Sequence, residues 1–148
     1  MRLDVPGFSQ ESGWTCLPAC IRMCLAYLGH DLGESTIVRA CGSTRLGTSW
    51  QQAIDGLERL GFECEFKPGS DVLFVLQHIA VDRPVILGIH RVSSLGIPTW
   101  HAVVVCGADE TAVQLIDPID GGRSQLEQTT LRRLWSLAGG GALVIESS

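Results

Sequence analysis

The sequence predicts an α+β fold, with helices in the first part of the chain and an antiparallel sheet in the second. Apolar residues recur at the helical period through the first 60 residues. Beyond them, short apolar runs are separated by turn-forming residues, which is typical of strands. A chain of 148 residues is long enough for one compact domain with its own core, and it contains no internal repeat or linker. We therefore expect a single domain spanning residues 1–148.

The N-terminal part is expected to begin with a short extended arm over residues 2–10. The first helix is expected over 16–28, because apolar positions there follow the helical period, with Thr15 as its N-cap and Gly29 just after its end. Two more helices follow from similar signals: one from about residue 35 to before Gly42, and one over 49–60, capped by Thr48 or Ser49 and stopped by Gly61.

The second part is expected to supply most of the sheet. FECEFK at 62–67 alternates like a half-buried strand, and VILGIH at 85–90 is an apolar run suited to a buried one. The other expected elements are a short helix around 71–80, strands over 101–109, 112–118 and 142–146, and a helix over 126–137.

Composition excludes several function classes. The net charge is −5, the arginines are scattered and the single lysine is Lys67, so we expect no basic surface of the kind that nucleic-acid binding requires. No secretion signal is recognisable, and no apolar run approaches the ~20 residues that span a bilayer, so we expect no membrane insertion and a cytoplasmic location. In that compartment the six cysteines are expected to be free thiols rather than a disulfide framework.

Three of these cysteines, Cys16, Cys20 and Cys24, stand four residues apart in the first helix. Structural zinc sites use close ligand pairs from separate segments, and the chain offers no second pair, so we expect neither a metal nor another cofactor. Cys20 and Cys24 are expected to be small core residues. Cys16 differs because it opens the helix, where unpaired N–H groups and the helix dipole favour a thiolate nucleophile.

A nucleophilic cysteine needs a base and a group that orients the base. His101 is expected to open a strand, and Asp117 to end the next one, so two adjacent antiparallel strands could bring their side chains together. Gln10 lies six residues before Cys16 and could donate a hydrogen bond to an oxyanion together with the Cys16 backbone N–H. Each residue alone is more often structural, but their roles are complementary.

Over nearly its whole length, the chain resembles the bacteriocin-processing cysteine peptidases, which are papain-like domains. The resemblance lies in Q-x5-C at Gln10 and Cys16, in the PAC that includes Cys20, in HAVVV from His101, in IDP at Asp117, and in the segments 46–65 and 83–90. Members of this family remove double-glycine leader peptides, often as the N-terminal part of an ABC exporter. The resemblance implies that Cys16 is the nucleophile, His101 the base, Asp117 the orienting acid and Gln10 the oxyanion donor.

The resemblance implies that the substrate is a peptide or protein, with a double-glycine-type leader as one candidate. It also implies a separate exporter as a candidate partner. Trp14 and Trp100 flank Cys16 and His101 in sequence and could contact that substrate, although core or rim packing is an alternative. Leu17 is a departure, because the family has a glycine after the nucleophile; its side chain could crowd or line the cleft.

The sequence is also compatible with two other functions. One is a peptide-binding module that keeps the fold and has lost the chemistry, which Leu17 mildly favours. The other is a different acyl-transfer enzyme, of the amidase or transglutaminase kind, because papain-like sites host several such reactions. Labelling of Cys16 no faster than that of a free thiol would favour the first, and exchange with an added amine would indicate the second.

Overall fold

The computed structural model describes residues 1–147, which form five helices and six strands. The helices are α1 (Cys16–Tyr27), α2 (Glu34–Cys41), α3 (Trp50–Arg59), α4 (Val72–Ala80) and α5 (Gln128–Leu137). The strands are β1 (Glu63–Lys67), β2 (Val85–Val92), β3 (Pro98–Ala108), β4 (Ala112–Asp117), β5 (Gly122–Glu127) and β6 (Ala142–Ser147).

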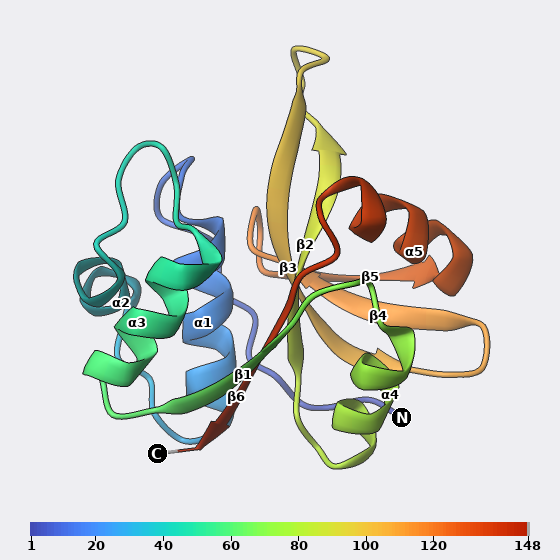
Figure 1. Ribbon diagram of the computed structural model, residues 1–148, viewed down its shortest axis with the longest axis horizontal. Coiled ribbons are helices and arrows are strands. Elements are labelled where there is room, and N and C mark those ends of the chain that lie inside the picture. The colour runs from blue at the N-terminus through green and yellow to red at the C-terminus, as the bar shows by residue number, and fades with distance from the viewer. Residues whose placement is uncertain (148) are drawn as a thin grey trace.

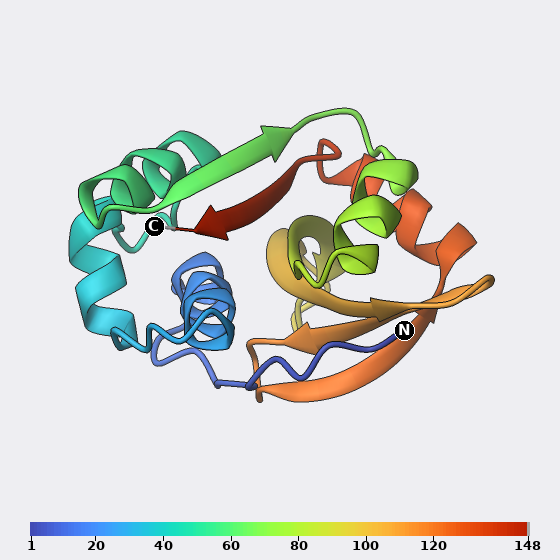
Figure 2. The same ribbon diagram turned by 90° about the horizontal axis from the view of Figure 1, so that it is seen from below.

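The molecule has a helical part and a sheet part, as the sequence predicted for an α+β fold. Figure 1 shows α1, α2 and α3 gathered on one side, with β1 and β6 crossing toward the other strands and α4 and α5 on the far side. All strands belong to one antiparallel sheet in the order β1-β6-β2-β3-β4-β5. Figure 2 shows α1 between the outer helices and the sheet, and α1 packs against β3. Among residues 1–147, no helix combines the length and the apolarity needed to cross a membrane.

Helix α1 is anchored by its apolar face, where Cys20 and Cys24 are buried as the sequence predicted. Thr15 stands at the predicted N-cap position but does not cap the helix with its side chain. Its hydroxyl instead accepts the Ser12 N–H and donates to the Ser12 carbonyl oxygen, both at 3.0 Å. These bonds close a compact turn immediately before Cys16 and so fix the start of the helix.

Helix α3 shows the capping chemistry that the sequence predicted. The Ser49 hydroxyl accepts the Gln52 N–H at 3.1 Å, while the Gln52 side-chain oxygen accepts the Ser49 N–H at 2.8 Å. This reciprocal pair identifies Ser49, rather than Thr48, as the cap. Gly61 ends the helix with φ +90°, a conformation that favours glycine.

The sheet differs from the prediction in two places. Strand β3 begins at Pro98 rather than at residue 101, so His101 lies within a strand and not at its start. Strand β5 was missed, because its six residues are mostly polar and exposed and show no apolar alternation. The helix expected from residue 126 consequently starts two residues later, at Gln128.

Candidate active site

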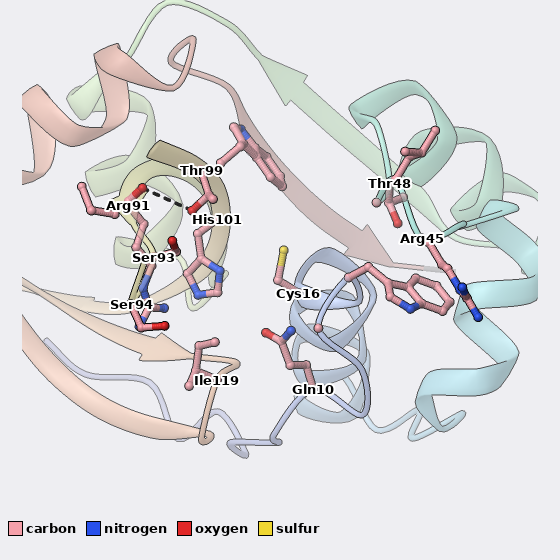
Figure 3. Close-up of a pocket in the computed structure, with 16 residues that line it drawn as sticks. Gln10, Cys16, Arg45, Thr48, Arg91, Ser93, Ser94, Thr99, His101 and Ile119 are labelled. Atoms are coloured by element: carbon pink, nitrogen blue, oxygen red, sulfur yellow. Dashed lines mark hydrogen bonds between the residues drawn. The ribbon is translucent and has the colours of Figure 1, made fainter. Parts of the chain in front are cut away.

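A pocket of about 750 Å³ lies where the N-terminal end of α1 faces β2 and β3 (Figure 3). Its walls come from the loop before α1, the loop before α3, the ends of β2 and β3 and the turn after β4. The lining residues are Gln10, Gly13, Trp14, Cys16, Arg45, Leu46, Gly47, Thr48, Arg91, Val92, Ser93, Ser94, Thr99, Trp100, His101 and Ile119.

Cys16 is the first residue of α1 and reaches the pocket as a half-buried free thiol. Figure 3 shows its sulfur opposite the imidazole of His101, with the side-chain amide of Gln10 on the same side of the pocket. At this position the sulfur lies at the end of α1 where the backbone N–H groups have no partner within the helix. The structure therefore gives Cys16 the position that sequence reasoning expected of it.

His101 and Asp117 are brought together by the pairing of β3 with β4, in which Val104 lies opposite Ile116. His101 Nε2 is 2.8 Å from Asp117 Oδ1, and the histidine is 6% exposed. The predicted proximity of these two side chains is confirmed. Since Nε2 is held by the carboxylate, Nδ1 is the ring nitrogen left to exchange a proton with Cys16.

The surroundings of His101 and Asp117 favour opposite charges on the two side chains. Burial alone lowers the pKa of His101, but its hydrogen bonds with Asp117 and Cys16 and their negative charges outweigh burial and raise that pKa above 6.5. Burial also raises the pKa of Asp117. Hydrogen bonds from His101 and the Ile119 N–H, with the charges of His101 and Arg91, bring it below 3.8.

These opposite shifts predict how stability depends on pH. The His101 contribution is fully present below pH 6.5 and is lost as the pH rises through its raised folded-state pKa. The Asp117 contribution is present above pH 3.8 and is lost as the pH falls through its lowered folded-state pKa. We therefore expect the decrease in free energy of unfolding caused by Asp117→Asn to be largest between those two values and smaller at alkaline pH. Urea unfolding across pH measures it, and a pH-independent decrease would contradict the pairing.

Arg91, on β2, is a part of the site that the sequence reasoning missed. Its Nη1 lies 3.1 Å from Asp117 Oδ2, while the Ile119 N–H donates to Oδ1 at 2.9 Å. No local signal marks Arg91 in the sequence, because its contact with Asp117 depends on the register of three strands. Asp120, the other aspartate of this segment, accepts the Gly122 N–H at 2.8 Å and so stabilises the turn.

Gln10 lies in a loop that is tied to its surroundings at several points. Its N–H donates to the Pro118 carbonyl oxygen at 2.6 Å, and its Nε2 donates to the Ser12 carbonyl oxygen at 2.7 Å. The buried carboxylate of Glu34 accepts the Glu11 N–H at 3.1 and 3.2 Å. The Gln10 Oε1 is buried and has no hydrogen-bond partner within residues 1–147. Nε2 carries two hydrogens and Ser12 takes one of them, so the amide has one donor left beside its unpaired acceptor.

The other residues expected near the substrate have different locations. Trp14 and Trp100 are half-buried and line the pocket. Leu17 is 1% exposed and packs in the core, because positions 17, 20, 21 and 24 share the buried face of α1. The expectation that Leu17 contacts the substrate is therefore not retained. Within the described residues, no group of three or more His, Cys, Asp and Glu side chains is arranged to hold a metal ion.

Comparison with protein families gives one match that covers nearly the whole chain. A family model described as Peptidase_C39 like family matches residues 2–143. A comparison with curated proteins finds no match.

Comparison with solved structures finds several chains with the same fold. The peptidase domain of Streptococcus ComA, a bifunctional ABC transporter of a quorum-sensing pathway, has a TM-score of 0.79 at 16% identity, covering 97% of this chain and 99% of that one. A double-glycine-motif protease from an AMS/PCAT transporter, in complex with the leader peptide, has a TM-score of 0.76 at 18% identity, covering 99% and 94%. A C39-like peptidase from Bacillus anthracis has a TM-score of 0.76 at 13% identity, covering 98% and 96%. At these identities the similarity establishes the papain-like fold.

Proposed function

Because the chain belongs to the Peptidase_C39 like family, we propose that it is a cysteine peptidase with Cys16 as nucleophile, His101 as general base and acid, and Asp117 as orienting acid. One observation carries most weight: the 2.8 Å bond from His101 Nε2 to Asp117 Oδ1, made by a histidine that lines the same pocket as Cys16. That bond keeps a proton on Nε2 and leaves Nδ1 for the thiol.

In the proposed mechanism, His101 Nδ1 takes the proton of Cys16, and the thiolate sulfur attacks the carbonyl carbon of the scissile peptide bond. The resulting oxyanion accepts hydrogen bonds from the Cys16 backbone N–H and from Gln10 Nε2. The C–N bond then breaks as His101 returns the proton to the leaving amine. Water, deprotonated by His101, hydrolyses the thioester and releases the free thiol. Asp117 holds the imidazole in orientation throughout.

The proposed substrate is a peptide or protein carrying a double-glycine-type leader. Among proteins of the same fold, one is a double-glycine-motif protease seen with its leader peptide, and another is the peptidase domain of an ABC transporter. An exporter is accordingly the proposed partner. Residues around Arg45 and around Ser93 line the pocket on opposite sides (Figure 3), and the proposed peptide lies between them.

Cleavage of synthetic leader-type peptides with a Gly-Gly site tests this function. We expect the wild-type chain to cut them, with products identified by mass spectrometry, and Cys16→Ala to leave them intact. Cys64→Ala is the matched control, because Cys64 is also a half-buried free cysteine but does not line the pocket. Tight binding without cleavage by the wild type would instead identify a binding module. An amide formed with an added amine would identify acyl transfer.

Replacing Gln10 with alanine is expected to separate chemistry from thiol reactivity. Loss of one oxyanion donor lowers kcat by roughly 10²–10³. Alkylation of Cys16 by iodoacetamide forms no oxyanion and should therefore remain near the wild-type rate. Peptide hydrolysis and alkylation rates, measured on the same preparation, check this. Equal loss of both would mean that Gln10 acts mainly through its bonds to Pro118 and Ser12.

A further inference from the structure

The Asp117 carboxylate is held from more sides than the proposed triad requires. Oδ1 accepts from His101 Nε2 at 2.8 Å and from the Ile119 N–H at 2.9 Å. Oδ2 accepts from Arg91 Nη1 at 3.1 Å. Of the hydrogen bonds made within residues 1–147, the one from Arg91 is the only one to Oδ2. The plane of the carboxylate is thus fixed by donors from β2, β3 and the turn after β4.

The strand register explains how Arg91 reaches this carboxylate. In the pairing of β2 with β3, Arg91 lies opposite Thr99 and Ile89 lies opposite His101. Residues two apart on a strand, and their direct partners, share one face of a sheet, so Arg91 and His101 project from the same face. Asp117 is on β4, on the other side of β3. The guanidinium therefore spans β3 to reach Asp117 beside the imidazole.

Arg91 contacts Asp117 and also lines the pocket. Arg91 and His101 both line the pocket, whereas Asp117 does not. The Arg91 side chain is 38% exposed and that of Asp117 is 30% exposed. A guanidinium placed there limits the access of water to the bond between His101 and Asp117, and it repels cationic groups that could compete for the carboxylate.

From these observations we propose that Arg91 is a positioning residue, which fixes the Asp117 carboxylate against His101 and covers their hydrogen bond on the pocket side. The role in catalysis rests on the proposed function; the role in fixing the His101–Asp117 pair does not. Arg91 acts through Asp117 and takes no part in the transfer of protons. The charged groups beside the imidazole are Cys16 from α1, Asp117 from β4 and Arg91 from β2.

Two effects of Arg91 on His101 act in opposite directions, and this makes the proposal testable. As a cation, Arg91 opposes the protonation of its neighbour His101. As the anchor of Asp117, it preserves the hydrogen bond that favours the imidazolium. If anchoring dominates, as we propose, removing Arg91 lowers the pKa of His101. If Arg91 acts only through its charge, removing it raises that pKa.

The experiment titrates His101 by NMR in the histidine-labelled full chain, comparing wild type, Arg91→Met and Arg91→Lys. The His101 signal is assigned by its absence in His101→Gln. Arg133→Met is the matched control, because Arg133 is an exposed arginine of α5 outside the pocket. We expect a lower His101 pKa in Arg91→Met and a value near wild type in Arg91→Lys, since a lysine can supply the single bond that Arg91 makes.

Peptide hydrolysis by the same variants gives the second measurement. We expect Arg91→Met to lower kcat roughly 10- to 100-fold, as a small misplacement of a catalytic group does. The alkaline limb of the pH–rate profile should move to lower pH, and Arg91→Lys should recover most of the activity. A purely structural loss would lower activity without moving that limb, and it would appear as a lower urea midpoint in both Arg91 variants.

An unchanged or raised His101 pKa in folded Arg91→Met would overturn the positioning role, even if the wild type cleaves peptides. A lowered pKa in a chain that cleaves no peptide would support the positioning role while the proposed function fails. The two conclusions are therefore separated by the NMR titration, which needs no substrate. If Arg91→Met does not fold, Arg91→Lys provides the test. A His101 pKa that differs from the wild-type value in Arg91→Lys would overturn the proposal that one hydrogen bond to Asp117 positions the carboxylate.

Discussion

Replacing His101 with alanine is expected to produce the largest loss of reactivity. The variant lacks the proposed base for the Cys16 proton and the proposed acid for the leaving amine. We expect peptide hydrolysis to fall about 10⁴- to 10⁶-fold. We also expect the rapid alkylation of Cys16 by iodoacetamide below pH 7 to disappear, because that reaction needs the thiolate that His101 stabilises.

The other cysteines make this measurement selective. Cys20, Cys24, Cys41 and Cys106 are buried, so Cys16 and Cys64 are the accessible thiols of the described chain. Burial raises the pKa of the Cys64 thiol, and the negative charges of Glu58 and Glu146 raise it further, so Cys64 serves as a slow internal reference. His30→Ala, which removes an exposed histidine, is the control. If Cys16 and Cys64 react alike in the wild type, or if His101→Ala labels Cys16 as fast as the wild type does, the catalytic assignment is wrong.

The second large effect is expected from Asp117→Asn, which keeps the shape of the side chain but exchanges an acceptor for a donor. Three N–H groups point at the Asp117 oxygens, from His101, Ile119 and Arg91. An asparagine must therefore face at least one donor with its own amide N–H. If its amide nitrogen takes the position of Oδ2, that nitrogen faces Arg91. If it takes the position of Oδ1, it faces Ile119 and His101, and the proton of His101 is then forced onto Nδ1. We expect kcat to fall by up to ~10⁴, as in a serine-protease triad with the same change.

A double variant provides a sharper form of this prediction. With Arg91→Met present, the asparagine amide can occupy the position of Oδ2 without facing a donor, while its oxygen still accepts from His101 and Ile119. We expect Arg91→Met/Asp117→Asn to be more active than Asp117→Asn alone, although each single change lowers activity. Steady-state kinetics of the four proteins measure this coupling. A double variant weaker than Asp117→Asn would contradict the geometry.

The sequence predicted most of what depends on local pattern. The helical period located α1 and α3, a capping residue located the start of α3, and with α1 came the position of Cys16 at a helix start. The succession of apolar strands was enough to place His101 beside Asp117, since consecutive strands joined by a short turn pair as antiparallel neighbours. What was missed depends on long-range or weak signals. Arg91 reaches Asp117 across an intervening strand, and β5 is an exposed edge strand without apolar alternation.

The packing of α1 against β3 divides the reactive groups between two layers. The imidazole, the carboxylate and the guanidinium belong to paired strands and are joined by hydrogen bonds, whereas the sulfur belongs to the helical part. A displacement of a few tenths of an ångström between the layers would change the gap from sulfur to imidazole and leave the other contacts intact. The reactivity of the Cys16 thiol therefore depends directly on the spacing between the two layers. A partner that binds to both layers would change the reactivity of the thiol without contacting a reactive atom.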